Sequence, residues 1–371
     1  MSLIKEELQT SKKNLTQRRI VTKDIDLEGL KNGEIIVQIE NFAFTSNNVT
    51  YGVAGEMMGY WQFFPTMNDP ENIWGCIPMW GFAEIKYSNN KELQVGERLF
   101  GYFPASNILT LKPIKISQKT FIDGEEHRKE LPPVYNNYLR LNNEDNYNKN
   151  NDNIRALLFP LHITSFCLCD YLQNENYLGA EQVIILSASS KTAIGLAQGL
   201  QSEEKKPEII GLTSKRNFEF VESLNSYDQI YSYDDLSDIN INNSSVMVDM
   251  AGNREILGKL HSSLGNQMIK CITVGMTHWD NETTADDEMG QLMNRDRTEF
   301  FFAPDHIQKR INDWGTDGYN KKTTSFMDAR AEQSKNWMTI KEVSGLNNFL
   351  DTYDEVIQGD INPNEGIIVN I

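Results

Sequence analysis

Apolar and polar residues follow two different patterns along this chain. In roughly the first 115 residues, short apolar or alternating stretches are separated by polar turns, which predicts a mostly β region. Beyond roughly residue 180, short apolar runs that fit buried parallel strands alternate with segments of helical spacing. Such alternation predicts βαβ units and a parallel sheet. The expected strands are 33–44, 81–88, 97–103, 183–189, 208–213, 246–252, 268–276 and 366–371, and the expected helices are 191–200, 216–225 and 255–264.

Length and local composition complete this outline. The chain has 371 residues, more than one hydrophobic core usually serves, so we expect two domains. The segment 136–153 is dominated by asparagine. Because asparagine favours turns over helices and strands, this segment is predicted to be a mobile loop.

The charge balance excludes several classes of partner. Asp and Glu number 52 against 35 Lys and Arg, which gives a formal net charge of −17. Such a surface repels phosphate backbones and anionic membranes, so neither nucleic acid nor membrane is an expected partner. No apolar run is long enough to span a bilayer, and the first residues lack the apolar core of a signal peptide. We therefore expect a cytoplasmic protein whose four cysteines are buried and reduced.

The turn after the first parallel strand has the small residues that a bound dinucleotide requires. Small side chains let the backbone approach a pyrophosphate, which rests on the amides of a helix N-terminus. The glycine fingerprint of such turns is absent, so the alternative is a serine-capped helix that binds no ligand. The candidate cofactor-binding residues here are Ser187, Ala188, Ser189, Ser190, Lys191 and Thr192.

A second turn indicates which dinucleotide would bind. NAD-binding folds place a carboxylate at this position to hold the ribose diol. Here the second strand ends in Thr213, Ser214, Lys215 and Arg216, and the turn contains no acid. Hydroxyls followed by two cations attract a 2′-phosphate, which predicts NADP(H). The alternative is that Lys215 and Arg216 only open an exposed helix, although cations are unfavourable at a helix N-terminus.

These segments together resemble the zinc-free, quinone-oxidoreductase-like part of the medium-chain dehydrogenase/reductase superfamily. Ser190, Lys191 and Ala193 stand where the superfamily turn has its three glycines. The segments 121–140 and 297–315 do not follow the general pattern and indicate a branch of unknown function. The segments that resemble the superfamily are 33–53, 94–102, 157–172, 178–200, 246–253 and 359–371.

The resemblance implies an α/β protein with a Rossmann-type, doubly wound parallel sheet and a GroES-like β-barrel catalytic domain built from both chain ends. The expected domains are the first catalytic part at 1–155, the nucleotide-binding domain at 156–295 and the return to the catalytic domain at 296–371. The resemblance places Thr164 beside the nicotinamide, and Gly275 is a further candidate for cofactor binding. It also implies a homodimer, paired through the strand at 268–276.

Candidate catalytic residues lie in the β region. A reductase without zinc must polarise a carbonyl by hydrogen bonds and supply a proton. Tyr51 matches a tyrosine of zinc-free relatives and could donate to a carbonyl oxygen, or it could be a core residue. Asn48 could hold the substrate or the nicotinamide, or it could satisfy a turn.

Weaker candidates for substrate binding are His127, Arg128 and Tyr135. Histidine titrates near neutral pH, and arginine can hold a carboxylate. The alternative for Arg128 is an ion pair with Glu125 or Glu126 on an exposed turn.

Metal chemistry is not expected. The alcohol-dehydrogenase branch of the superfamily has zinc ligands where this chain has Ser46-Asn47-Asn48 and Trp80-Gly81-Phe82, and the five histidines are scattered. The leading hypothesis is an NADPH-dependent reductase of an activated C=C or C=O bond in a small molecule, such as a quinone or enone. The alternative is an NADPH-binding sensor or regulatory protein with little or no turnover.

Overall fold

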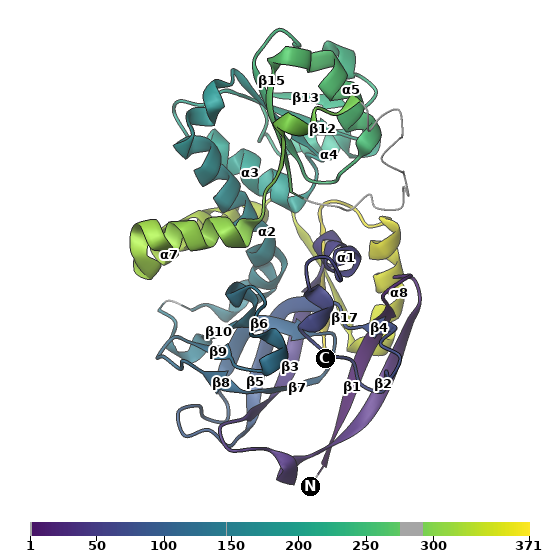
Figure 1. Cartoon of the computed structure of the whole chain (residues 1–371), viewed down its shortest axis with the longest axis vertical. Coiled ribbons are helices and arrows are strands. Elements are labelled where there is room, and N and C mark those ends of the chain that lie inside the picture. The colour runs from purple at the N-terminus through teal and green to yellow at the C-terminus, as the bar shows by residue number, and fades with distance from the viewer. Residues whose placement is uncertain (1, 146, 275–291) are drawn as a thin grey trace. The chain divides into compact units, whose positions relative to one another are not determined.

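The computed structural model describes residues 2–145, 147–274 and 292–371, and the chain divides into two compact units (Figure 1). The first unit comprises Met1–Leu157 and Thr339–Ile371, so both ends of the chain belong to it. The second unit comprises Leu158–Met338. We expected the chain to return to the first domain at residue 296, but the boundary lies at Thr339.

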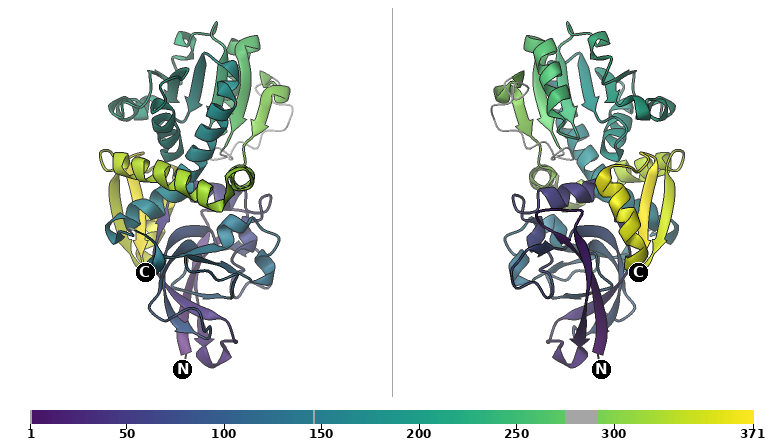
Figure 2. Two further views of the ribbon diagram at one scale, coloured as in Figure 1. Left: turned by 90° about the vertical axis from the view of Figure 1, so that its left-hand side faces the viewer. Right: turned by 90° about the vertical axis from the view of Figure 1, so that its right-hand side faces the viewer.

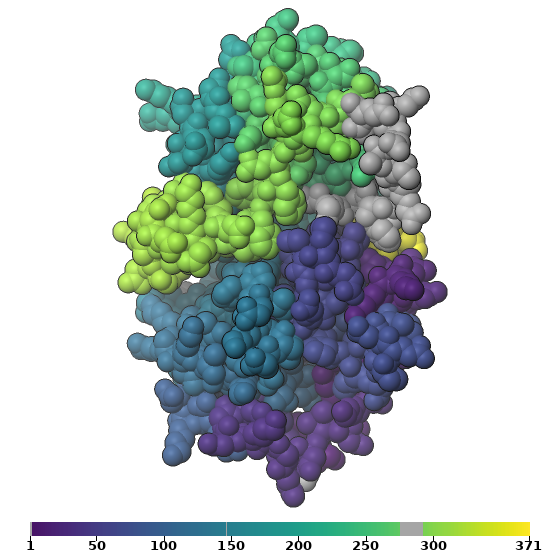
Figure 3. Space-filling view, viewed as in Figure 1, coloured from purple at the N-terminus to yellow at the C-terminus, as the bar shows by residue number. Residues whose placement is uncertain are grey.

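The later boundary has a physical cause in the long helix α7 (Ala303–Ser334), which packs within the second unit. Its His306 and Arg310 both contact the carboxylate of Asp170 on α2 (Asp152–Asn174). The ring of Phe326 lies against Gly199 of α3 (Lys191–Gln201). The helix is kinked at Gly315, whose φ of 72° favours glycine. In the space-filling view, α7 is the light green ridge (Figure 3).

The first unit is mostly β and is built around β3 (Ile35–Phe44), whose apolar residues are all buried. Its larger sheet has the order β17-β18-β3-β5-β6-β10-β9-β8, and β7 also pairs with β3. A smaller sheet has the order β2-β1-β4. The other elements of this unit are β1 (Ser2–Ser11), β2 (Arg18–Asp26), α1 (Ser46–Val53), β4 (Trp74–Gly75), β5 (Pro78–Ser88), β6 (Arg98–Pro104), β7 (Ile108–Leu111), β8 (Pro113–Ile114), β9 (Thr120–Asp123), β10 (Asn137–Arg140), β17 (Thr339–Ser344), α8 (Gly345–Gln358) and β18 (Glu365–Asn370).

The second unit contains a parallel sheet in the order β13-β12-β11-β14-β15-β16. The strands β11, β12 and β14 are each followed by an α-helix, as the alternating pattern predicts. Besides α2, α3 and α7, its elements are β11 (Gln182–Leu186), β12 (Glu208–Thr213), α4 (Phe218–Ser223), β13 (Gln229–Ser232), β14 (Ser245–Asp249), α5 (Arg254–Leu264), β15 (Met268–Thr273) and β16 (Thr298–Phe300).

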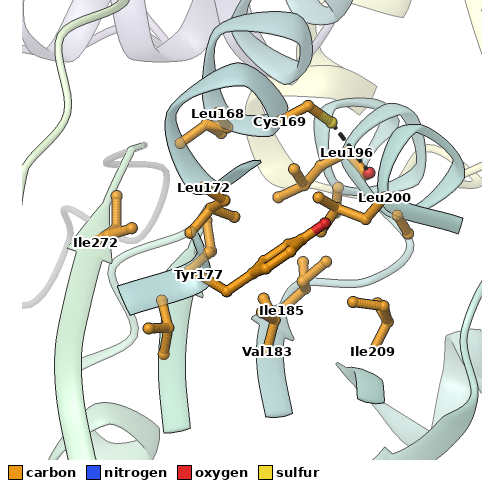
Figure 4. Close-up of a cluster of buried hydrophobic side chains, with 14 of the residues drawn as sticks. Leu168, Cys169, Leu172, Tyr177, Val183, Ile185, Leu196, Leu200, Ile209 and Ile272 are labelled. Carbon is orange, nitrogen blue, oxygen red and sulfur yellow. Dashed lines mark hydrogen bonds between the residues drawn. The ribbon is translucent and has the colours of Figure 1, made fainter. Parts of the chain in front are cut away.

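Helices cover both faces of this sheet (Figure 2). Val183 and Ile185 of β11 point to one face, where they pack against α2 and α3 (Figure 4). Ile184 and Leu186 point to the other face, where they pack against α5. Because both faces are buried, the strands are continuous apolar runs rather than alternating ones. No helix in the described ranges is both long and apolar enough to cross a membrane.

The structure differs from the sequence expectations at two further places, besides the domain boundary. The asparagine-rich segment 136–153 is not simply a loop, because β10 pairs with β6 and β9 through residues such as Leu139. The strand expected at 268–276 is described as β15, and it is not an edge of the sheet. Its outer side pairs with β16, so it is not exposed for dimer pairing as we expected.

Candidate functional site

The parallel sheet has a point where its winding reverses, between β11 and β14. From β11 the chain builds outward through β12 and β13, and then crosses to β14 on the other side of β11. In open α/β sheets, ligands bind outside the carboxyl ends of the strands at such a switch point. The turns that follow β11 and β12 contain the residues that the sequence analysis selected for cofactor binding.

The turn between β11 and α3 is compact. Ser187 has a positive φ of 55°, which a residue with a side chain rarely adopts. The N–H of Ser190 donates to the carbonyl oxygen of Ser187 at 2.8 Å and closes the turn. The Ser190 side chain then caps α3, because its hydroxyl accepts from the N–H of Ala193 at 3.2 Å. Ser190 is therefore a helix cap, as the alternative interpretation proposed, but a cap does not exclude a ligand.

The turn keeps hydrogen-bond donors that a phosphate could use. Among the residues that the structure describes, the N–H groups of Ser189 and Thr192 donate no hydrogen bond. Both residues are partly exposed. Ala188 is buried, and its N–H donates to the carbonyl oxygen of Leu212 on β12 at 2.9 Å. Small side chains, open amides and a helix N-terminus are the features that a pyrophosphate requires, so these residues fit a dinucleotide.

The second turn, after β12, combines a buried residue with two exposed cations. Thr213 is buried, and its carbonyl oxygen accepts from the N–H of Tyr233 at 2.9 Å. Ser214 precedes a short 3₁₀ turn that contains Lys215 and Arg216, both exposed. Lys215 forms an exposed ion pair of 3.0 Å with Asp234, and this pair raises the pKa of the lysine. An acid from the next turn thus lies beside the expected phosphate site, although none is adjacent in sequence.

Asp249 is a buried carboxylate at the end of β14, the strand across the switch point. It accepts hydrogen bonds from the N–H groups of Ala251 at 3.1 Å and Gly252 at 2.8 Å. Burial nevertheless raises its pKa to about 6, because removal from water disfavours the charged form. Asp249 therefore titrates closer to neutral pH than an ordinary aspartate.

The remaining two cofactor candidates, Thr164 and Gly275, add little to the description of the site. Thr164 lies on α2 and is partly exposed, and its hydroxyl donates to the carbonyl oxygen of Pro160 in the same helix at 3.2 Å. Its neighbour Ser165 bonds to the carbonyl oxygen of Thr192 at 2.8 Å, so this part of α2 contacts the start of α3. Gly275 lies outside the described residues.

The two catalytic candidates of the first unit are both buried. The amide oxygen of Asn48 accepts from the N–H of Thr45 at 2.8 Å, and its nitrogen donates to the carbonyl oxygen of Pro78 at 2.9 Å. Asn48 thus satisfies the start of α1, which is the structural alternative that the sequence left open. Burial raises the pKa of the Tyr51 phenol, so Tyr51 stays neutral and keeps its proton.

Tyr51 belongs to a cluster of tyrosines. Its ring lies 4.6 Å from that of Tyr60, 5.6 Å from that of Tyr102 and 6.4 Å from that of Tyr135. The hydroxyls of Tyr60 and Tyr135 are 3.3 Å apart. The buried hydroxyl of Tyr102 makes no hydrogen bond of good geometry in the described structure, although Tyr51 lies near enough to affect its pKa. The cluster offers neutral phenols and no charge.

The three weaker substrate candidates differ in how deeply they are buried, and Arg128 is the most buried of them. Arg128 is fully buried and pairs with buried Asp123 at 3.0 Å, not with Glu125 or Glu126 on an exposed turn. Its Nε also donates to the carbonyl oxygen of Phe63 at 2.9 Å. These bonds make Arg128 an internal structural residue.

The other two candidates are more open than Arg128. His127 is exposed, and one ring nitrogen lies 3.2 Å from the Phe63 carbonyl oxygen. Tyr135 is partly exposed and belongs to the tyrosine cluster. Within the described residues, no group of three or more His, Cys, Asp or Glu side chains could hold a metal ion.

Sequence reasoning missed the side chains that contact the β11–α3 turn. Tyr233 accepts from the N–H of Ser187 at 2.9 Å, and Tyr227 donates to the carbonyl oxygen of Ala188 at 2.8 Å. Asn217 donates to the hydroxyl of Ser189 at 3.1 Å. For Asn217 and Tyr233 the available signal was their position, because they follow β12 and β13 at the same carboxyl edge of the sheet. Tyr227 precedes β13, and its place along the chain provided no such signal.

Several solved structures have a fold that is similar to this chain over almost its whole length. A search of curated proteins finds no significant match to the sequence. The chain is similar to CurA from Vibrio vulnificus in complex with NADPH, with 12% identity, 98% of each chain covered and a TM-score of 0.63. It is also similar to the ETR1P/NADP/crotonyl-CoA complex, with 11% identity, 100% of each chain covered and a TM-score of 0.57. A third similar structure is the quinone oxidoreductase from Coxiella burnetii, with 12% identity, 100% of each chain covered and a TM-score of 0.55.

At such identities the likeness shows the fold. It confirms the expected combination of Rossmann-type and GroES-like architecture. A family model described as "Protein of unknown function (DUF2855)" matches residues 42–362, which is most of the chain. The chain therefore belongs to the DUF2855 family.

Proposed function

We propose that this chain is an NADPH-dependent, zinc-independent oxidoreductase that reduces an activated C=C or C=O bond in a small molecule. The main support is the open turn at 187–192, which lies at the switch point of a doubly wound sheet. Further support comes from similar folds that were crystallised with NADPH, or with NADP and crotonyl-CoA. Crotonyl-CoA contains an activated C=C bond, and a quinone oxidoreductase shares the fold.

The second unit would hold the cofactor. The amides of Ser189 and Thr192 would bind the pyrophosphate, with Ser187, Ala188 and Ser190 small enough to allow its approach. Thr213 and Ser214 lead into Lys215 and Arg216, which would attract the 2′-phosphate, and Lys191 would add a cation beside the pyrophosphate. Thr164 is proposed to contact the nicotinamide, and Gly275 is proposed as a further cofactor-binding residue. When bound, NADPH would supply the hydride for the electrophilic carbon of the substrate.

The first unit would supply polarisation and a proton. The neutral phenol of Tyr51 can donate a hydrogen bond to the carbonyl oxygen of a quinone or enone and stabilise the charge that develops there. Tyr51 or water would then protonate the atom that becomes anionic. Tyr135 and the exposed His127 are proposed as flanking substrate contacts, whereas Arg128 is engaged internally.

A second candidate function is an NADPH-binding sensor or regulator with little turnover. The observation that favours it is the engagement of Asn48 and Arg128 in hydrogen bonds within the first unit. The two functions are separated by NADPH oxidation, followed by absorbance over a panel of quinones and enones. Turnover that falls strongly in Tyr51→Phe supports the reductase with Tyr51 as proton donor. NADPH binding without oxidation of any panel member supports the sensor.

We also propose that the protein is a cytoplasmic homodimer. The outermost strand on one side of the described parallel sheet is β16, and the side chain of its Phe300 is 48% exposed. An edge strand with an exposed apolar side chain such as that of Phe300 can pair with a second copy. Light scattering should show a dimer at micromolar concentration and a monomer for Phe300→Lys. A monomeric wild-type protein contradicts this proposal.

A further inference from the structure

We propose that Tyr227, Tyr233 and Asn217 form a clamp that holds the β11–α3 turn, which lacks the glycine fingerprint, in its phosphate-binding conformation. The inference rests on the proposed dinucleotide site, but it concerns residues that would not touch the cofactor. They are positioning residues, because they act on the turn through side-chain hydrogen bonds. The three hydrogen bonds reach three consecutive residues of the turn, at positions 187, 188 and 189.

The first contact stabilises an unfavourable backbone conformation. Ser187 has a φ of 55°, where glycine is at ease and a residue with a Cβ is strained. In this conformation its N–H points to Tyr233 and donates to the phenol oxygen at 2.9 Å. The Ser187 hydroxyl lies 3.3 Å from the same oxygen. The hydrogen bond to Tyr233 thus offsets the free-energy cost of a backbone conformation that glycine would adopt without strain.

The second contact brings the turn close to the neighbouring strand. The hydroxyl of Tyr227 donates to the carbonyl oxygen of Ala188 at 2.8 Å. Space for this arrangement comes from Gly211 on β12, where an added Cβ would lie 2.8 Å from the Tyr227 ring and 3.1 Å from the Cβ of Ala188. The glycine that permits close approach therefore lies on β12 and not in the turn itself.

The third contact joins the two turns of the proposed site. Asn217 closes the 3₁₀ turn Lys215–Asn217, and its side-chain nitrogen donates to the hydroxyl of Ser189 at 3.1 Å. The segment that would bind the 2′-phosphate thus also positions the segment that would bind the pyrophosphate.

The clamp leaves the proposed ligand contacts open and adds no charge. Its bonds use the N–H of Ser187, the carbonyl of Ala188 and the hydroxyl of Ser189, but not the N–H groups of Ser189 and Thr192. Burial raises the pKa of the Tyr227 and Tyr233 phenols, so both stay neutral beside a bound anion. A carboxylate in either place would repel a phosphate.

The test uses the full chain and measures NADPH affinity by fluorescence titration. Tyr233→Phe removes one hydroxyl and should weaken NADPH binding by about tenfold, since one hydrogen bond is lost and the strain at Ser187 is no longer offset. The matched control is Tyr231→Phe on β13, two residues before Tyr233, which should bind NADPH as the wild type does. The decisive variant is Tyr233→Phe with Ser187→Gly. Because glycine adopts a positive φ without help, it should restore the affinity.

Each outcome has a defined meaning. Unchanged affinity in Tyr233→Phe, or no recovery with Ser187→Gly, overturns the clamp. If the wild-type protein does not bind NADPH, the proposed function fails, and the clamp is then judged by hydrogen–deuterium exchange in a peptide covering residues 183–193. Faster exchange in Tyr233→Phe that returns to the wild-type rate with Ser187→Gly supports the clamp, and equal exchange in all variants overturns it.

Discussion

The two units differ in how far their polar candidate residues are already engaged. In the first unit, Asn48 bonds to two backbone segments and Arg128 is locked to Asp123 in the interior. In the second unit, the β11–α3 turn is partly exposed and its amides at Ser189 and Thr192 remain open in the described structure. The cofactor site therefore has stronger structural support than the set of catalytic side chains.

The difference follows from the architecture of each unit. Polar side chains inside a mostly antiparallel β domain must be paired, because an unpaired buried polar group costs free energy. At the carboxyl edge of a parallel sheet, helices begin and leave N–H groups that have no partner within the helix. A polar residue in the first setting is thus more often structural, and a backbone amide in the second is a natural ligand donor.

The largest expected effect tests the structural role of Arg128. Arg128→Ala leaves Asp123 buried without its partner and should lower the free energy of unfolding by about 3–5 kcal/mol, measured by urea denaturation. The matched control is Lys119→Ala, which breaks an ion pair with Asp145 on the surface and should change stability little. A variant of Arg128 that keeps its stability and loses only activity would show that this residue binds substrate instead.

A smaller effect concerns Asp249, a buried carboxylate of the second unit that accepts two backbone hydrogen bonds. Its pKa is raised from the usual 3.8 to about 6 by burial, so the folded protein holds the proton more tightly than the unfolded chain. Its contribution to stability is fully present below about pH 4 and is lost as the pH rises through about 6, a change on the order of 3 kcal/mol. Urea denaturation between these pH values should show this decrease in the wild type and not in Asp249→Asn. Parallel pH profiles would mean that Asp249 titrates normally.

A weaker effect separates the two dinucleotides. Replacing Lys215 and Arg216 together by Ala should weaken NADPH binding by roughly tenfold and leave NADH binding nearly unchanged, because only NADPH has the 2′-phosphate. Since Asp234 already pairs with Lys215, Asp234→Ala should strengthen NADPH binding in the otherwise unchanged chain. Calorimetric titration measures the affinity of each variant for NADPH and for NADH. Equal losses for NADPH and NADH would contradict the assignment of this turn to the 2′-phosphate.

Sequence patterns were most informative for the second unit. The strand β12 spans 208–213 as expected, and α3 extends one residue beyond the expected 191–200. Strands buried on both faces are continuous apolar runs, which stand out in a sequence. By contrast, β10 was hidden because it begins an asparagine-rich segment, and its pairing with β6 and β9 depends on contacts distant in sequence.

Only those parts of the candidate site whose residues are adjacent in sequence could be predicted. The turns at 187–192 and 213–216 were visible because small residues and cations are adjacent in the chain. Tyr233 and Asn217 were not visible, since they reach the turn from other strand ends only after the sheet has formed. For the same reason, Asp123 was not foreseen as the partner of Arg128, although it lies five positions away at the buried end of β9.

The most direct test of the central claim compares two substitutions at Ser190 by NADPH titration. Both Ser190→Ala and Ser190→Leu remove the hydroxyl that caps α3, so they share that loss of helix stability. Only Ser190→Leu adds a bulky side chain to the surface that a pyrophosphate would approach. The account predicts that Ser190→Ala binds NADPH with a loss of about 0.5–1.5 kcal/mol, whereas Ser190→Leu stays folded and does not bind. Equal NADPH affinity in the two variants would mean that the dinucleotide does not bind at this turn.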